Sequence, residues 1–540
     1  MNTVEKNGIV ELAFTASGTD PNPYMTAGMS VSFTAPSGKS FTTGGFWDGG
    51  QHWKARFAPD ETGQWHWHSR SADAGLDGAS GGFEVGPTLS ASPWRVHGPL
   101  SLHPSARGFS HADGVPVFWL ADTVWSVPAH ATLEEWRHYL TRRAAQGFNV
   151  VQINSLPQWD ASGPPLRQPF LTTEGKEDVS HPDPTYFRFL DQVVAMAAAA
   201  GMIASIVLLW FENTPGDNEH WNIKVKRRGP FTAETARAHA RHLVARYEAY
   251  GATWIVSGDS SYNTPASTDL YDLTGEVVRA VSARPPMTTT HLNGGTAPSP
   301  ELNARSWLDF NIFQSCHFRD SAERARTYAT LARSFVPARP VLNSEPCYDS
   351  LRMMDADNTA GHRFSREDVR RASWISLLSG ANAGLSYGAH GTWPWHRDGQ
   401  DYGAIHYGLP LDWRMALDLE SGDDMTRIKA FFEGVPWWDI APAAGAVCDP
   451  PQAHLATAKA GASTLLVYVQ GPVKVGLPSL ILTDAASFWF DPSMGKTTDA
   501  KPDVDGYFHT WSLAEAAKDR VLMVTNAKLQ SGAILPISPS

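Results

Sequence analysis

The sequence is poor in cysteine, in long apolar runs and in positive charge. Its three cysteines, Cys316, Cys347 and Cys448, are too few for a disulfide framework, and their spacing matches no zinc-ligand pattern. Since no apolar run reaches about 18 residues, no transmembrane helix is expected. The net charge of −11 argues against nucleic acid or an anionic membrane as a partner. We therefore expect a globular protein that binds neither.

The beginning of the sequence also lacks the features of a secretory signal. Residues 1–8 contain no basic segment followed by an apolar one. Together with the few cysteines, this makes a reduced, cytoplasmic setting the simplest expectation. A secreted or periplasmic protein would require that a signal had been removed. The oligomeric state is not readable from the sequence, and a homo-oligomer is left open.

Tryptophan, in contrast, is abundant, with 21 residues in the chain. An indole ring stacks on the apolar face of a sugar while its N–H reaches a hydroxyl group. Core packing accounts for about two thirds of such large aromatic residues, so only those close to predicted strand ends are candidates for substrate contact. Trp125, Trp210 and Trp393 are our candidates for sugar stacking.

Both ends of the chain show the two-residue period of β-strands. Between residues 1 and 90, runs such as Met29–Phe33 and Trp53–Phe57 alternate apolar and polar residues, with glycine-rich turns between them. Short strands at this spacing predict an immunoglobulin-like β-sandwich over residues 1–90. The same period returns in Ser463–Val469 and predicts a C-terminal β-sandwich over residues 437–540.

Between these ends, apolar strand-like runs alternate with helical patterns. The predicted helices include Leu133–Gln146, Pro184–Ala200 and Ala233–Tyr250, and the eight predicted strands are Val115–Asp122, Phe148–Asn154, Met202–Trp210, Thr253–Gly258, Met287–Leu292, Phe310–Cys316, Pro340–Glu345 and Ala383–Gly388. Near-continuous apolar strands, each followed by a helix or a long connection, are typical of a closed parallel barrel. The predicted fold class is multidomain, with a (β/α)8 TIM barrel over residues 91–436 between the two sandwiches.

Two acidic residues stand at the ends of predicted strands. Asp259 follows Thr253–Gly258, and Glu345 ends its own strand 86 residues further along. A barrel of eight units uses about 250 residues, so this interval is close to three units. Both carboxyl groups are therefore expected at one mouth, on the fourth and seventh strands. Glycoside hydrolysis requires such a pair across a concave site. For Asp259 the alternative is a structural role as a helix cap. For Glu345 a purely structural role is less favoured, because glutamate is a poor capping residue and a charge at the end of an apolar strand needs a partner.

Other polar side chains are expected at the same mouth because they also end or follow strands. The candidates for contacts with sugar hydroxyl groups are Asp122, Gln152, Asn154, His291, Gln314 and His317. For Asp122, bracing of the following loop is the alternative. The expected partner is a carbohydrate substrate, either an oligo- or polysaccharide or a small glycoside.

Two other function classes are open to the same residues. His291, His317 and His390 with Asp259 allow a zinc site, as in barrel amidohydrolases. However, the first strand ends in Ala121-Asp122-Thr123 and lacks a His-x-His pair, so we expect no metal and no cofactor. A carbohydrate-binding protein without catalysis is the other alternative, and the presence of both central acids does not favour it.

Several motifs of the barrel region resemble the apiosidase-like glycoside hydrolases. They are Phe118–Trp125, Gln146–Gln152, Ser257–Asp259 and Asn343–Asp349, and they occur in order at the expected strand ends. The resemblance covers most of residues 95–435. The flanking regions are also similar to that family's usual companions, an N-terminal immunoglobulin-like domain and a C-terminal β-sandwich.

The resemblance implies a retaining glycosidase in which Asp259 is the acid/base and Glu345 the nucleophile. These roles demand different pKa values, so we expect Asp259 in the less solvated or the more anionic setting. The family removes the branched furanose apiose from pectic side chains, which implies a furanoside substrate of the apiose, arabinofuranose or fructofuranose type. Two departures from the family pattern, Ser257 in place of glycine and Asp349 in place of glutamate, leave both acids intact.

Overall fold

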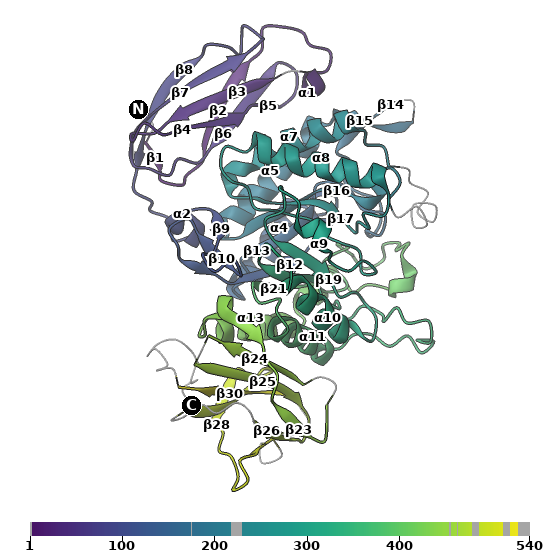
Figure 1. Ribbon diagram of the computed structural model, residues 1–540. Helices are drawn as coiled ribbons and strands as arrows, with labels where there is room; N and C mark the ends of the chain where they lie inside the picture. The colour runs from purple at the N-terminus through teal and green to yellow at the C-terminus, as the bar shows by residue number, and fades with distance from the viewer. Residues whose placement is uncertain are drawn as a thin grey trace.

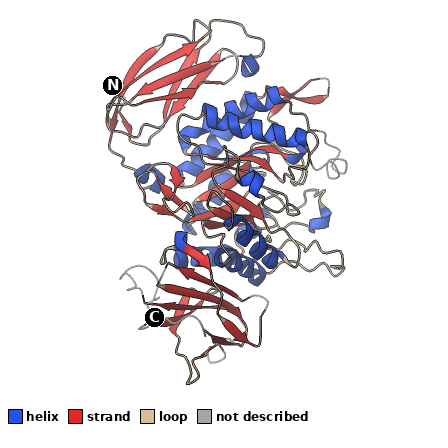
Figure 2. Cartoon of the chain, viewed as in Figure 1, coloured by secondary structure: helices blue, strands red, loops and turns tan. Residues whose placement is uncertain are grey.

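The computed structural model describes residues 3–26, 28–173, 175–217, 229–452, 455–461, 463–477, 485–510 and 519–526. A β-rich N-terminal part and a β-rich C-terminal part lie at opposite ends of a central part built from strands and helices (Figures 1 and 2). This is the multidomain arrangement that the change of periodicity along the sequence predicts.

Two sheets make up the N-terminal part. One has five strands in the order β1 (Thr3–Glu5), β8 (Ser80–Gly86), β7 (Gly63–Ser71), β3 (Met29–Thr34) and β4 (Ser40–Gly44), and the other three in the order β2 (Val10–Thr15), β6 (His52–Phe57) and β5 (Phe46–Trp47). Phe33, Trp65 and Phe57 belong to one hydrophobic core that both sheets share. The alternation of apolar residues thus predicted a two-sheet packing correctly, while the immunoglobulin-like label stays a prediction.

The central sheet has eight parallel strands in barrel order. From one edge to the other, they are β18 (Thr288–Thr289), β17 (Thr253–Gly258), β16 (Ile203–Trp210), β13 (Val150–Asn154), β12 (Trp119–Thr123), β21 (Gly384–Tyr387), β20 (Val341–Glu345) and β19 (Asn311–Gln314). The two edges meet, because the Asp309 backbone N–H donates to the Thr288 carbonyl at 2.8 Å. All eight predicted strands are present, and the barrel is nearly closed.

Helices surround the barrel strands. The longer ones are α4 (Leu133–Ala145), α5 (Pro184–Ala199), α7 (Ala233–Tyr247), α8 (Pro265–Val281), α10 (Ser321–Arg333), α11 (Arg366–Leu378) and α13 (Ser421–Phe432). α4 begins at a capping box in which Thr132 and Glu135 each accept a backbone N–H of the other. The link between β18 and β19 is irregular and contains only the short α9 (Pro300–Asn303). Of the described helices, none is long and apolar enough to span a membrane.

Shorter helices, strands and turns lie between these longer elements along the chain. They are α1 (Pro23–Thr26), α2 (Pro93–His97), β9 (Leu100–Leu102), β10 (Phe109–His111), β11 (Pro116–Val117), α3 (Val127–His130), β14 (Phe170–Thr173), β15 (Lys176–Pro182) and α12 (Trp413–Leu417), with the 3-10 turns η1 (Phe211–Asn213), η2 (Glu248–Tyr250), η3 (Ile405–Tyr407) and η4 (Trp437–Asp439). Two predicted boundaries were wrong. The expected strand from Val115 is split into β11 and β12, and the expected strand Met287–Leu292 keeps only the two residues of β18 and an isolated bridge from Leu292 to Ser260.

The C-terminal part also has two sheets around one core. A six-stranded sheet runs in the order β22 (Ile440–Pro442), β24 (Ala456–Ala460), β25 (Thr464–Gln470), β30 (Asp519–Thr525), β27 (Ala486–Asp491) and β28 (Lys496–Asp499), and a three-stranded sheet in the order β23 (Val447–Asp449), β26 (Lys474–Gly476) and β29 (Phe508–His509). Val467, Val475 and Leu522 lie in the core between them. The last residues assigned to this predicted domain, 527–540, lie outside the described residues.

Candidate active site

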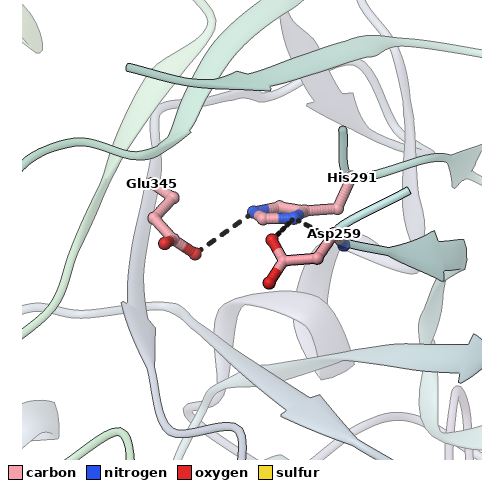
Figure 3. Close-up of side chains that lie close together, drawn as sticks. All are labelled: Asp259, His291 and Glu345. Carbon is pink, nitrogen blue, oxygen red and sulfur yellow. Dashed lines mark hydrogen bonds and ion pairs between the residues drawn. The ribbon is translucent and has the colours of Figure 1, made fainter. Parts of the chain in front are cut away.

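The two predicted acids meet at one end of the barrel. Asp259 directly follows β17, the fourth strand in sequence order, and Glu345 is the last residue of β20, the seventh. One carboxylate oxygen of Asp259 and one of Glu345 lie within 4.8 Å of each other. Figure 3 shows the two carboxyl groups approaching from different strands with the His291 ring between them. The strand count from the sequence therefore placed both acids correctly.

His291 faces both acids with opposite ring nitrogens. Its Nδ1 lies 3.7 Å from Asp259 Oδ1, and its Nε2 lies 3.4 Å from Glu345 Oε2. The Asp259 backbone N–H donates to Nδ1 at 3.5 Å. Because Nδ1 then acts as an acceptor, the ring proton belongs on Nε2, which faces Glu345. The backbone at Asp259 thus sets which nitrogen His291 presents to the other acid.

His317 holds Glu345 in the same manner from the neighbouring strand end. Its Nε2 lies 3.0 Å from Glu345 Oε1, while the Tyr348 backbone N–H donates to Nδ1 at 3.4 Å. Burial by itself would raise the pKa of Glu345, but the hydrogen bonds from His291 and His317 outweigh it and hold that pKa well below its usual range. Glu345 is therefore ionised at neutral pH.

Asp259 has the opposite electrostatic setting. Burial raises its pKa, and the negative charge of Glu345 raises it further, to about 7, against the influence of His291 and of a hydrogen bond from Gln314. Gln314 Nε2 donates to Asp259 Oδ1 at 2.6 Å and to the Leu292 carbonyl at 3.0 Å, so these two acceptors orient the NH₂ end of its amide. The Asp259 side chain is 28% exposed and that of Glu345 9%. Of the two expected settings for Asp259, the structure shows the more anionic one.

The backbone at the barrel mouth adopts conformations that non-glycine residues seldom take. Asp259 has φ 48° and Cys316, which follows β19, has φ 63°. Aspartate tolerates this left-handed region better than most residues, at a cost of about 1–3 kcal/mol for strained positions. Such strain gathers at functional sites, and here it turns the Asp259 side chain toward Gln314 and His291.

Gly258 lets Trp210 lie directly against the backbone before Asp259. A Cβ at this position would lie 2.0 Å from two carbons of the Trp210 ring. Trp210 is itself buried and packs edge-on against Trp125, with ring centroids 5.5 Å apart. The glycine of the Ser257–Asp259 motif is thus required by the close approach of an indole ring.

Replacing Gly258 with alanine is expected to lower the free energy of unfolding by about 1–3 kcal/mol, because the buried ring has to move. Displacement of Trp210 and Asp259 should also lower kcat/KM by about 10-fold or more. Urea unfolding and steady-state kinetics on one aryl glycoside measure the two effects. Gly403→Ala is the matched control, since a Cβ there would meet no atom within 4 Å. Equal stability and activity of the two variants would contradict the packing argument.

A cavity of about 300 Å³ opens beside the two acids. Five predicted contact residues line it, namely Trp125, Trp210, Gln314, His317 and Trp393. His291 is fully buried between the acids and acts on them rather than on the cavity wall. Aromatic walls with a few polar groups are typical of small-ligand sites, and three indole rings suit the apolar faces of a sugar.

Three predicted contact residues lie away from this cavity. Asp122 is fully buried and accepts hydrogen bonds from Arg143 Nε at 2.6 Å and Tyr139 Oη at 2.5 Å. It ties β12 to α4 and has no access to a substrate. Gln152 lies inside the barrel, where Ser386 donates to its Oε1 at 2.8 Å. Asn154 Oδ1 accepts the Leu156 backbone N–H at 3.1 Å, so this oxygen shapes the loop after β13.

Several residues of the cavity wall were missed in the sequence. They come from the long connections after the barrel strands and include Gln158, Trp159, Asp160, Asn293, Tyr348 and Tyr407. Tyr348 packs against His317 with ring centroids 4.6 Å apart. It stands in the Asn343–Asp349 motif, which was a usable signal. For Gln158 to Asp160 the signal was weaker, a tryptophan and an acid in the loop after the second strand.

Among the described residues, Asp259, His291 and Glu345 are the group that could hold a metal ion. This group differs from the zinc set of the amidohydrolase alternative, in which His390 takes part, because His390 Nε2 faces the Gly408 carbonyl at 2.9 Å. A metal requires one His291 nitrogen near both carboxylates, at about 2 Å from the ion. The shortest contact to each acid comes from a different ring nitrogen, Nδ1 for Asp259 and Nε2 for Glu345. This arrangement suits proton and hydrogen-bond chemistry better than chelation.

Comparison with known proteins identifies two families along the chain. Residues 103–439 match the family described as "Apiosidase-like, catalytic domain". Residues 3–72 match a "Domain of unknown function (DUF5060)". A comparison with curated proteins found no match.

Solved structures share the fold over most of the chain. A glycoside hydrolase family 5 protein from Bacteroides vulgatus is 22% identical, with a TM-score of 0.68 over 83% of this chain and 98% of that one. A protein described as "Glycoside hydrolase" is 22% identical, with a TM-score of 0.67 over 81% and 99%. A second Bacteroides vulgatus protein is 16% identical, with a TM-score of 0.69 over 97% and 100%. At these identities the likeness shows a common fold.

The family match supplies what the structural likeness alone does not. It extends over more than half of the chain and includes both acids of the barrel mouth. The chain therefore belongs to the family of apiosidase-like catalytic domains and is a glycosidase.

Proposed function

We propose that the protein is a retaining glycosidase in which Glu345 is the nucleophile and Asp259 the acid/base. The observation that carries this proposal is the pair of opposite pKa shifts at the barrel mouth. Glu345 keeps its negative charge because its pKa is held low. The pKa of Asp259 is raised to about 7, so this residue keeps its proton at pH values below that. Two carboxyl groups with such different environments suit the two roles of a double displacement.

In the first step, a Glu345 oxygen attacks the anomeric carbon of the sugar. The glycosidic carbon–oxygen bond breaks, and the departing oxygen takes the proton of Asp259. In the second step, the Asp259 carboxylate takes a proton from water, whose oxygen attacks the same carbon. The bond to Glu345 breaks, so that both side chains return to their starting protonation states.

The spacing of the acids supports retention. Retaining glycosidases hold their carboxyl groups about 5–5.5 Å apart, whereas inverting enzymes need about 6.5–9.5 Å to admit a water molecule between the general base and the sugar. Here the closest oxygens of Asp259 and Glu345 lie within 4.8 Å. A separation of this size leaves room for direct attack by Glu345.

We further propose a furanoside substrate of the apiose, arabinofuranose or fructofuranose type. The family match supports apiose-like sugars, and a cavity of about 300 Å³ lies at the small end of ligand sites, as a single sugar ring requires. Trp125, Trp210 and Trp393 are proposed to pack against its apolar face.

The stereochemistry of the product tests the retaining mechanism directly. The enzyme is incubated with a panel of aryl furanosides of several pentoses and of fructose, and proton NMR follows the first sugar released before it mutarotates. We expect the product to appear first with the anomeric configuration of the substrate. First appearance of the opposite anomer would assign Asp259 and Glu345 to an inverting mechanism instead.

A further inference from the structure

A third carboxyl group stands on the wall of the same cavity. Asp160 lies in the connection after β13, together with Gln158 and Trp159, and all three line the cavity beside Asp259 and Glu345. Asp160 is 7% exposed and Gln158 5%. Neither residue has a part in the two-step displacement, so their burial next to the acids needs another explanation.

Both side chains carry a buried oxygen that is left without a hydrogen bond. Within the part of the chain that the structure describes, Asp160 Oδ1 and Gln158 Oε1 have no partner. A buried polar atom in this state destabilises the folded protein, and folded proteins tolerate few of them. The two oxygens belong to residues two positions apart on one loop, and both residues line the cavity, which points to polar groups left for a ligand.

The surroundings of Asp160 decide what kind of ligand group this is. Burial raises the pKa of Asp160 well above its usual range, and the negative charges of Asp259, Glu212 and Glu345 raise it further. The uncharged carboxyl group both donates and accepts hydrogen bonds. Of the described residues that line the cavity, none is a lysine or an arginine. Hydroxyl groups match this wall, because each also donates and accepts and brings no charge.

We propose that Asp160 and Gln158 bind two neighbouring hydroxyl groups of the sugar ring that Glu345 attacks, and so determine which sugar the enzyme accepts. The inference rests on the proposed function and adds to it a specificity-determining pair from the loop after β13. It assigns the hydroxyl-bearing edge of the ring to this loop and the apolar face to the indole rings.

A mutant cycle against deoxygenated substrates tests the contact. The wild type, Asp160→Asn and Asp160→Ala are assayed on the p-nitrophenyl furanoside that the wild type hydrolyses fastest and on its monodeoxy analogues. Asp160→Ala should lower kcat/KM about 10- to 100-fold on the parent glycoside, since the hydrogen bond to the substrate is lost. On the analogue that lacks the bound hydroxyl, the same substitution should change kcat/KM less than about 3-fold. Asp160→Asn should retain part of the contact, so its kcat/KM on the parent glycoside should lie between those of the wild type and Asp160→Ala.

Asp398→Asn is the matched control, because it removes a carboxylate from an exposed position in the loop after β21. It should leave kcat/KM within about 2-fold of the wild type on every substrate. An equal loss for Asp160→Ala on the parent and on all monodeoxy analogues would overturn the proposal, because a structural disturbance does not depend on one hydroxyl group. Wild-type activity of Asp160→Ala would overturn it as well.

Sugar binding separates this inference from the proposed function. Tryptophan fluorescence is titrated with free pentoses and with fructose in the wild type and in Asp160→Ala, since four tryptophans line the cavity. Weaker sugar binding by Asp160→Ala, in a protein that hydrolyses no glycoside of the panel, would support the contact while the proposed function fails. Equal binding by the two proteins, or no binding by the wild type, would overturn the contact.

Discussion

Glu345→Ala is expected to lower kcat/KM about 10⁴-fold or more on any glycoside that the wild type hydrolyses. The substitution removes the atom that forms the bond to the anomeric carbon, and nucleophiles that act within a catalytic unit show losses of this order. Glu345→Gln should lose nearly as much, because its amide keeps the shape of the side chain but is a poor nucleophile. Single-turnover and steady-state assays on a p-nitrophenyl furanoside measure both variants.

Rescue by a small anion identifies the lost function as nucleophilic. Azide has room to attack the anomeric carbon in Glu345→Ala from the side that Glu345 occupied, and the product should be a glycosyl azide of inverted configuration. Exposed Asp357, on the connection after β20, provides the control, since Asp357→Ala removes a carboxylate without reaching the cavity. Near-normal activity of Glu345→Gln would remove Glu345 from the mechanism, and another acid of the mouth would have to replace it.

The position of the two acids was predictable because it depends on a repeat. Parallel strands of a barrel return to the same mouth after every unit, so an acid at the end of one apolar run and an acid about three units later had to lie at one mouth. The same reasoning placed His291, Gln314 and His317 next to the acids. Which acid each of these side chains contacts was not predictable from the sequence. For the histidines it depends on backbone groups, such as the N–H of Tyr348, that set the orientation of the ring.

Asp122 shows how the reasoning from strand ends fails. Successive residues of a strand point to opposite faces of the sheet. Ala121 lies in the core inside the barrel, whereas Leu120 belongs to the core between the strands and the helices. Asp122 follows the parity of Leu120 and therefore meets Arg143 of α4. If the acid stood one residue earlier or later in the strand, its side chain would point into the barrel. Reasoning from strand ends does not distinguish these two faces, because the sequence does not locate a strand end to one residue.

The loops carried the part of the site that the sequence did not reveal. Asp160, Gln158 and Tyr407 lie in connections without a repeating pattern, so no periodicity places them relative to the acids. Their proximity arises only when the connections after β13 and β21 fold over the same mouth. The β-rich character of the two flanking parts was easier to predict than these loops. Alternation of apolar residues is a local property of the sequence, and both two-sheet cores follow from it.

Asp259→Ala is expected to separate substrates by their leaving groups. For an alkyl or sugar leaving group, whose oxygen needs a proton as the bond breaks, kcat/KM should fall about 10²- to 10⁴-fold. For p-nitrophenol, which leaves as an anion, the first step should lose much less. Hydrolysis of the glycosyl-enzyme then lacks its base, so kcat and KM for the aryl substrate should fall together. Steady-state kinetics on a matched aryl and alkyl furanoside measure the difference.

The pH profile tests the same role from the electrostatic side. The pKa of Asp259 is raised to about 7, so its proton is present below that pH and is lost as the pH rises through it. Wild-type kcat/KM should therefore decline above about pH 7, whereas Glu345, whose pKa is held low, stays ionised over the whole neutral range. In Asp259→Ala the decline should disappear for the aryl substrate, because no proton donor remains to be titrated. Asp398→Ala should keep the wild-type profile. A decline that persists in Asp259→Ala, or an equal loss on aryl and alkyl substrates, would assign the acid/base role to a different group.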